Sequence, residues 1–237
     1  MTEPLWIGLI IGLAALVQSV TGFGFALVAV SLLPLLMDLH AAVLLVIALS
    51  LVSNVVLLWH YRHSFEWSRV GHLLGAALVT IPLGVVALNY VPEQLALRLL
   101  GGLILAYVAY SWLQLSPPNL SDIRWAYAFG AASGLLTGAF NTGGPPIVVY
   151  ASCNQWSPEQ FKGNMPGVFC ATSVAAIAAH LWDGSFTPDL WQPIAYAAPF
   201  FLGGLGLGLW LSRHIAPDRF RQAVLVLLSV MGLKLLW

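Results

Sequence analysis

Two short polar stretches interrupt long apolar runs of the chain, and their residue types suit the binding of an anion. The first stretch contains Gln18-Ser19 and then Thr21-Gly22-Phe23-Gly24. The second contains Thr137-Gly138 and then Asn141-Thr142-Gly143-Gly144-Pro145. Hydroxyl and amide groups donate hydrogen bonds to an oxyanion, and glycine lets a ligand approach backbone N–H groups closely.

A helix is expected to begin just after each stretch, near 22–24 and near 144–146. Proline suits the first turn of a helix, because its missing N–H would have had no partner there. The start of a helix carries a partial positive charge and unpaired N–H groups, so it can hold an anion without a cationic side chain. The alternative is that these glycines only pack helices together, as GxxxG spacings do.

The composition places the elements that carry these stretches in a membrane. Of the 237 residues 59% are hydrophobic and only 8% are charged, whereas a soluble domain has about 25% charged residues. The fold class predicted is therefore an all-α polytopic membrane protein. The net charge is zero, so the sequence lacks the excess of basic residues that is typical of nucleic-acid-binding proteins. No signal peptide, disulfide framework, metal motif or cofactor motif is expected.

Six stretches are long enough to cross a bilayer, which takes about 20 apolar residues. They are 41–60, 69–89, 93–113, 163–182, 190–211 and 219–236. Four shorter stretches, 5–17, 24–37, 125–138 and 145–153, each cover only about 20 Å as helix. They predict two re-entrant hairpins, 5–37 and 125–153, with kinked full crossings as the alternative.

The basic residues predict an orientation for these spans. If the loop 61–69 is cytoplasmic and each hairpin returns to its own side, seven of the nine Lys and Arg lie inside. Those seven are Arg62, Arg69, Arg124, Lys162, Arg213, Arg219 and Arg221. Both termini then face outward, the periplasmic side of a bacterial inner membrane. All nine carboxylates fall in or beside predicted loops.

The chain is predicted to be an inverted repeat of 1–116 and 117–237, each a hairpin plus three spans. Thr21-Gly22 aligns with Thr137-Gly138, and Val91-Pro92-Glu93 aligns with Ala216-Pro217-Asp218. Loops that are equivalent in the two halves carry opposite charge, so they are expected on opposite sides of the membrane. Inverted repeats with paired helix breaks are typical of secondary transporters whose site lies near the midplane.

Other polar residues lie inside or beside the predicted spans and are candidates to line a transport path. They are Ser53, Asn54, Lys162, Asn164, Thr172 and Ser173. The alternative is that Ser and Asn bond neighbouring helices, and that Lys162 faces solvent or lipid headgroups. Cys170 and His180 are ten residues apart on one helix, about 15 Å, too far to act as a nucleophile and base.

At these residues the chain resembles the TauE/SafE family of sulfite exporters, also called TSUP permeases. The resemblance rests on Val20-Thr21-Gly22-Phe23-Gly24, on Gly134 to Gly138 with the following Gly143-Gly144-Pro145-Pro146, and on Lys162-Gly163. It covers nearly the whole chain. It implies secondary transport, commonly export, of small sulfur-containing anions such as sulfite or organosulfonates across a bacterial inner membrane.

Together these observations predict a transporter, not an enzyme, that works by alternating access around an anion site formed by the two hairpin tips. Three alternatives stay open: an anion channel, a membrane-embedded enzyme and a structural subunit. The expected partners are the small anionic substrate and the lipid bilayer. Small-residue helix faces would permit a homodimer without requiring one.

Overall fold

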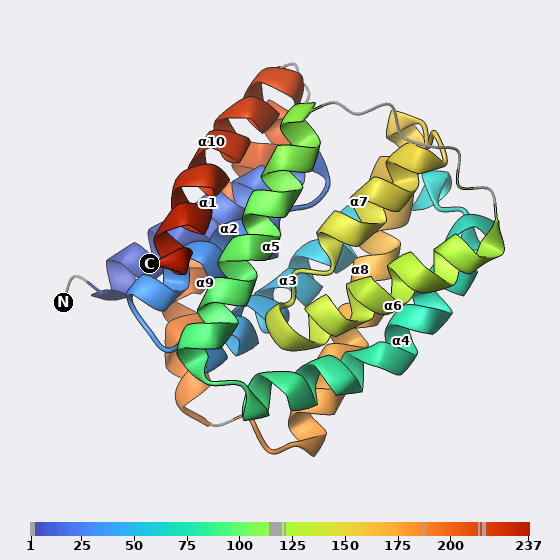
Figure 1. Ribbon diagram of the computed structural model, residues 1–237. Helices are drawn as coiled ribbons and strands as arrows, with labels where there is room; N and C mark the ends of the chain where they lie inside the picture. The colour runs from blue at the N-terminus through green and yellow to red at the C-terminus, as the bar shows by residue number, and fades with distance from the viewer. Residues whose placement is uncertain (1–2, 114–119, 121, 187, 213, 215–216) are drawn as a thin grey trace. The chain divides into compact units, whose positions relative to one another are not determined.

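The computed structural model describes residues 3–113, 120, 122–186, 188–212, 214 and 217–237, and these form helices joined by short turns, with no strand among them (Figure 1). The helices are α1 (Glu3–Thr21), α2 (Phe25–Leu32), η1 (Leu33–Leu35), α3 (Leu39–Tyr61), η2 (Arg62–Ser64), α4 (Trp67–Tyr90), α5 (Glu93–Leu113), α6 (Ile123–Phe140), α7 (Gly144–Cys153), α8 (Pro158–Trp182), η3 (Pro188–Leu190), α9 (Trp191–Leu211) and α10 (Pro217–Leu236). Arg213, Ala216 and the predicted repeat boundary at 116/117 lie outside the described residues.

The all-α polytopic fold is confirmed. Six helices in the described part of the chain are long and apolar enough to span a membrane. Five of them, α3, α4, α5, α8 and α9, coincide with predicted spans. The sixth is α1, over Pro4–Thr21. Helix α10, of 20 residues, covers the remaining predicted span, 219–236.

The predicted lengths of the hairpin segments were wrong for the first arm of each hairpin. Helix α1 has 19 residues and α6 has 18, which makes them about 28 Å and 27 Å long. The small polar residues at their ends do not stop the helix, because hydroxyl groups such as that of Ser19 bond back to a carbonyl four residues earlier. Only the returning arms α2 and α7, of 8 and 10 residues, are short.

Two compact units make up the chain, and each draws helices from both predicted repeats. Unit 1 comprises residues 1–49, 91–115 and 187–237, and unit 2 comprises 50–90 and 116–186. The first hairpin therefore belongs with α5, α9 and α10, and the second hairpin with α4 and α8. Within α3 the chain passes from unit 1 to unit 2 after Leu49.

In unit 1 the long hairpin arm α1 packs along α9 so closely that their backbones are in contact, and α10 packs along α5 (Figure 1). A Cβ added to Gly204 would overlap the carbonyl oxygen of Gly12, and one added to Gly208 would lie 2.6 Å from Cβ of Ser19. Residues later in α1 contact residues later in α9, so the two helices run parallel.

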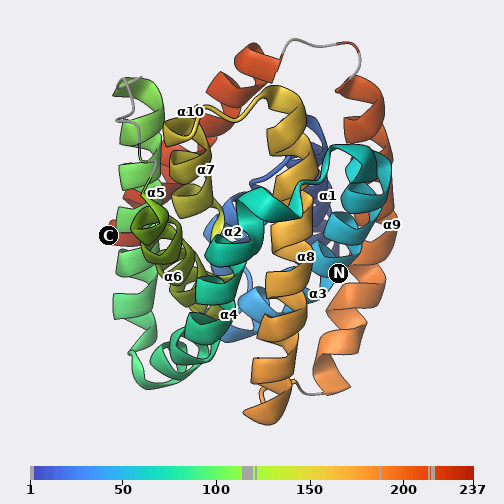
Figure 2. The same cartoon turned by 90° about the vertical axis from the view of Figure 1, so that its right-hand side faces the viewer.

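In unit 2 the long hairpin arm α6 packs along α4 in the same close and parallel way, and α8 also contacts α4 (Figure 2). A Cβ on Gly134 would overlap the carbonyl oxygen of Ala77, and one on Gly138 would overlap that of Ile81. Small residues let helix backbones approach this closely, which is how helices associate in lipid.

All four Lys and Arg residues of unit 2 lie at one end of it. Arg69 and Arg124 stand near the starts of the parallel helices α4 and α6, and Arg62 lies in η2. Lys162 stands near the start of α8, which contacts η2. The predicted orientation, with loop 61–69 in the cytoplasm, requires these four basic residues to lie at the same end of unit 2.

Candidate functional site at the helix breaks

The first break, between α1 and α2, is a turn that only glycine adopts easily. Gly22 and Gly24 have φ of 86° and 98°, in the left-handed region that side chains with a Cβ disfavour. The N–H of Gly22 donates to the carbonyl of Gln18 at 2.7 Å, so α1 keeps its hydrogen bonding to its last residue. Helix α2 then begins at Phe25.

Side-chain hydroxyls at the first break bond within the break itself. The Ser19 hydroxyl donates to the carbonyl of Ala15 at 2.8 Å. Oγ1 of Thr21 lies 2.9 Å from the carbonyl oxygen of Val17 and 2.6 Å from that of Phe23. These contacts hold the turn in shape and leave these two hydroxyls engaged.

The surroundings of the first break are apolar and tight. The ring of Phe23 meets the ring of Tyr107 edge-on, with 5.9 Å between centroids. A neighbouring cavity of about 20 Å³, lined by these two residues, Thr21 and mostly aliphatic side chains, has room for about one water molecule. The substrate-binding role predicted for Gln18, Ser19, Thr21, Gly22, Phe23 and Gly24 stays a prediction.

The second break, between α6 and α7, turns at an asparagine. Asn141 has φ of 54°, and asparagine tolerates this left-handed conformation better than most residues. Its N–H donates to the carbonyl of Thr137 at 2.8 Å, and the N–H of Thr142 donates to that of Leu136 at 3.2 Å. Gly143 is required here because a Cβ would overlap Oγ1 of Thr137.

Ser133, which the sequence analysis missed, secures this turn from within α6. Its buried hydroxyl donates to the carbonyl of Gly143 at 2.8 Å. The clue in the sequence is its position one turn before Thr137, on the same helix face, since residues four apart are neighbours on a helix. The bond ties the end of the break to the body of α6.

One polar group at the second break has no partner. Thr142 is 1% exposed, and its Oγ1 makes no hydrogen bond in the part of the chain that the structure describes. Leaving a buried hydroxyl unpaired costs about 1–3 kcal/mol. The residue before it, Asn141, donates from Nδ2 to Oγ of Ser50 at 2.9 Å.

Ser50 also fixes the depth of the second break along a candidate span. It is the twelfth of the 23 residues of α3, and therefore stands at the middle of that helix. The break thus lies level with the centre of a helix long enough to cross the membrane. At that depth no water is available to satisfy an unpaired polar group, so such a group is costly.

The binding role expected of backbone N–H groups at the second break stays a prediction, and two of these groups have partners within the protein. The N–H groups of Asn141 and Thr142 are already bonded, and Pro145 and Pro146 have none. The start of α7 keeps its dipole. Asn141 and Thr142 can therefore offer a ligand their side-chain donors but not their backbone N–H groups.

No charged side chain accompanies these groups among the described residues of unit 2. Arg124 stands 17 residues before Asn141 on α6, about 25 Å along the helix axis. The ammonium of Lys162 lies over the ring of Tyr61, 5.9 Å from its centroid, at the end of the unit that holds the basic residues. The second break is therefore polar and electrically neutral.

The predicted path residues separate into two groups. Ser53, Asn54, Thr172 and Ser173 are buried inside α3 and α8. Their role in a path stays a prediction. Lys162 and Asn164 lie instead near the start of α8, which contacts the turn between η2 and α4.

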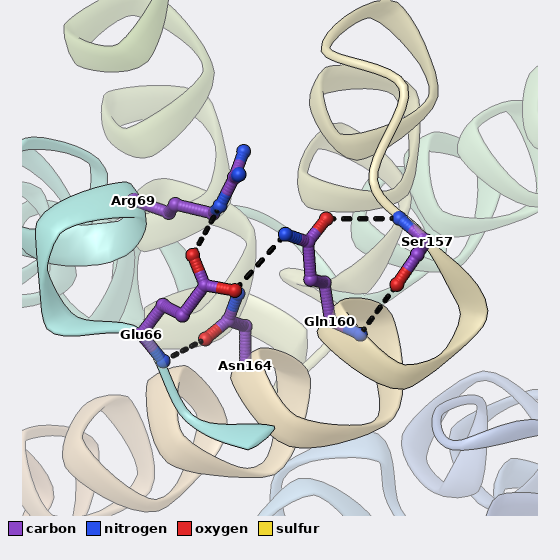
Figure 3. A network of polar contacts seen from close by, with 5 residues as sticks. All are labelled: Glu66, Arg69, Ser157, Gln160 and Asn164. Atoms are coloured by element: carbon purple, nitrogen blue, oxygen red, sulfur yellow. Dashed lines mark hydrogen bonds and ion pairs between the residues drawn. The ribbon is translucent and has the colours of Figure 1, made fainter.

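Figure 3 shows how that turn is held on α8. Oδ1 of Asn164 accepts from the N–H of Glu66 at 2.7 Å, and Nε2 of Gln160 donates to Oε1 of Glu66 at 2.9 Å. Glu66 also pairs with Arg69. The bond from Arg69, and then that from Gln160, lowers the pKa of the Glu66 carboxyl. Asn164 is 0% exposed, and its bond to Glu66 holds this turn on α8. The Nδ2 atom of Asn164 has no hydrogen-bond partner among the described residues.

Three comparisons with known proteins bear on this chain. The family model described as "Sulfite exporter TauE/SafE" matches residues 7–235. The chain belongs to the TauE/SafE family. The residues on which the sequence resemblance rested, at both breaks and at Lys162-Gly163, all lie within the matched range.

Two curated relatives of this TauE/SafE chain carry transporter names. A "Probable sulfite/organosulfonate exporter TauE" of Cupriavidus necator is 25% identical over 96% of this chain and 91% of its own length. A "Probable inner membrane transporter protein TsaS" of Comamonas testosteroni is 27% identical over 72% of each chain. No solved structure matches. The family is therefore one of multi-pass membrane transporters rather than enzymes.

Proposed function

We propose that this chain is a secondary transporter that exports small sulfur-containing anions, such as sulfite or organosulfonates, across a bacterial inner membrane. The observation that carries the proposal is the unpartnered hydroxyl of Thr142, fully buried at the start of α7 and level with the middle of α3. The name of the Cupriavidus necator relative supports the direction and the substrate class. The name of the Comamonas testosteroni relative supports the membrane.

The bound anion completes the hydrogen bonding of the second break in this proposal. One oxygen accepts from the Thr142 hydroxyl, and others accept from the Ser50 hydroxyl and the Asn141 amide, which now bond each other. The positive end of the α7 dipole adds to the attraction. The binding group is thus made of Ser50, Asn141 and Thr142, with Gly143, Gly144 and Pro145 shaping the turn behind them.

Transport by alternating access requires parts that move and parts that stay intact. The glycine contacts of α1 with α9 and of α6 with α4 leave no room for sliding, because backbone meets backbone. We therefore assign these helix pairs to rigid parts within their units. The movement that opens the site in turn to each side takes place elsewhere than at these contacts.

Thermal stabilisation of the purified protein by small anions tests the site. Sulfite, thiosulfate, sulfoacetate, taurine, sulfate, acetate and chloride form the panel. A ligand at 100 times its Kd stabilises a protein that binds it only when folded by about 2.7 kcal/mol. The double variant Asn141→Ala/Thr142→Ala should lose this stabilisation, whereas Ser152→Ala, which removes a hydroxyl elsewhere on α7 that bonds Val148, should keep it.

Flux measurements separate a transporter from a channel. In liposomes loaded with unlabelled sulfite, a transporter exchanges it for labelled sulfite outside and its rate saturates. A channel gives conductive flux without exchange. Exchange that disappears in the double variant but not in Ser152→Ala would support the proposal; conduction without exchange would replace it by the channel alternative.

A further inference from the structure

The charge pattern of unit 2 restricts which anions the second break can accept. Its charged groups stand in turns or near helix ends: Arg62, Glu66, Arg69, Asp122, Arg124, Glu159, Lys162 and Asp183. Its histidines are three exposed residues, His60 near the end of α3, His63 in η2 and His72 in the second turn of α4, and the buried His180 in the last turn of α8. The break itself holds neutral donors only.

A neutral site in a low-dielectric interior favours singly charged anions over doubly charged ones, because the doubly charged ones cost more to desolvate. The cost of moving an ion from water into a low-dielectric interior rises with the square of its charge, so a dianion costs about four times as much as a monoanion of the same size. Two hydroxyls and one amide replace part of the hydration of an ion, but they supply no counter-charge. A doubly charged oxyanion would need a cation within a few ångströms, and Arg124 on the same helix is about 25 Å away.

We propose that the second break selects singly charged sulfur oxyanions, so that sulfite crosses as hydrogensulfite and not as the dianion. The inference rests on the proposed function and narrows its substrate class. Organosulfonates with one negative charge fit the same site, since their three oxygens meet the Ser50, Asn141 and Thr142 donors and their charge is spread over the head group. Sulfate and the sulfite dianion do not.

Selecting the monoanion also couples transport to protons without a carboxylate relay. Each hydrogensulfite that leaves carries one proton with it, so no buried Asp or Glu is required. The carboxylates of unit 2 stand in its turns and near helix ends, away from the break, in keeping with this. The pH dependence of sulfite transport then belongs to the substrate rather than to a side chain of the protein.

The test uses the full-length protein in liposomes with the same pH inside and outside. Initial uptake of labelled sulfite is measured at fixed total sulfite from about pH 6 to about pH 9, across the second ionisation of sulfurous acid. Methanesulfonate, which is singly charged throughout this range, is the control for the protein's own pH response. Sulfate, which is doubly charged throughout, is the second control.

We expect sulfite uptake to fall about tenfold for each pH unit above that ionisation, following the hydrogensulfite fraction. Methanesulfonate uptake should stay constant, and sulfate should neither be taken up nor compete. Sulfite uptake that is constant or rises with pH, or sulfate uptake comparable with that of methanesulfonate, would overturn the inference while leaving the transporter proposal standing. A parallel fall for sulfite and methanesulfonate would overturn it too, because the protein would then be the titrating partner. No uptake of any sulfur oxyanion would overturn the proposed function itself.

Discussion

At the scale of single residues, the binding role proposed for Thr142 carries a cost to the stability of the ligand-free protein. A hydroxyl that is buried without a partner destabilises the ligand-free protein, and it contributes only when an acceptor arrives. Stability and affinity should therefore respond to its removal in opposite directions. A purely structural threonine would not behave in this way.

Thr142→Val, which keeps the shape and removes the hydroxyl, should raise the stability of the ligand-free protein by about 1 kcal/mol. It should weaken sulfonate binding about tenfold, equivalent to about 1.4 kcal/mol. Thr142→Ser retains the hydroxyl and should bind as the unaltered protein does. Melting curves with and without methanesulfonate measure both effects, and unchanged affinity in the valine variant would remove Thr142 from the site.

Asn141 combines a backbone role with a side-chain role, and substitutions separate them. Asn141→Gly adopts the left-handed turn easily and loses only the amide that bonds Ser50. Asn141→Asp is nearly isosteric but places a negative charge beside the anion. We expect the glycine variant to bind sulfonates more weakly and the aspartate variant to show no stabilisation by them at neutral pH. Equal stabilisation of both variants would contradict a role for Asn141 in binding.

At the scale of elements, glycines decide which helices pair. Gly138 lies against the backbone of α4, whereas Gly75, on α4 itself, faces open space in which a Cβ meets nothing within 4 Å. The two residues therefore form a matched pair for testing the contact between α6 and α4.

Gly138→Ala should destabilise the protein by about 1–3 kcal/mol, because the added methyl group must push two backbones apart. Gly75→Ala should be neutral or stabilise by up to about 1 kcal/mol, since alanine is the better helix former. Thermal unfolding in one detergent compares them. A Gly138→Ala variant as stable as Gly75→Ala would show that the two helices are not in backbone contact.

The turn that Glu66 holds on α8 should loosen in acid. The pKa of Glu66 is lowered from its ordinary value of 4.5, so its stabilising contribution is complete above that value and is lost as the pH falls through the lowered pKa. Glu66→Gln has no such titration. The melting temperature of the unaltered protein should therefore drop more than that of the variant between about pH 5 and pH 3, by a small amount because the side chain is exposed. Identical pH profiles would show that Glu66 contributes nothing through its charge.

At the scale of the whole molecule, the orientation in the membrane is still a prediction, and it is based on the basic end of unit 2. In a variant with Cys153 and Cys170 replaced by alanine, single cysteines are introduced by His63→Cys and Asp189→Cys, both at exposed positions. An impermeant maleimide should label the Asp189→Cys variant in intact cells, and the His63→Cys variant only after the membrane is opened. The reverse pattern would invert the topology.

The sequence by itself determined the membrane class, five of the spans and the two breaks. These features follow from local rules: apolar runs of sufficient length cross the bilayer, and polar, glycine-containing clusters such as Thr21 to Gly24 and Asn141 to Pro145 favour a break in a helix. Gly22, Gly24 and Asn141 could be recognised because their left-handed conformations are properties of the residues themselves.

Only the tertiary structure decided which helices pair and which polar groups are occupied. The hairpin of one predicted half packs with helices of the other, as α1 does with α9, because close contact depends on which glycines face each other across distant segments. The sequence likewise treated Thr21 and Thr142 alike. The structure shows the first hydroxyl engaged with its own turn and the second buried with no partner, since hydrogen bonding depends on what the fold brings within 3 Å of each oxygen.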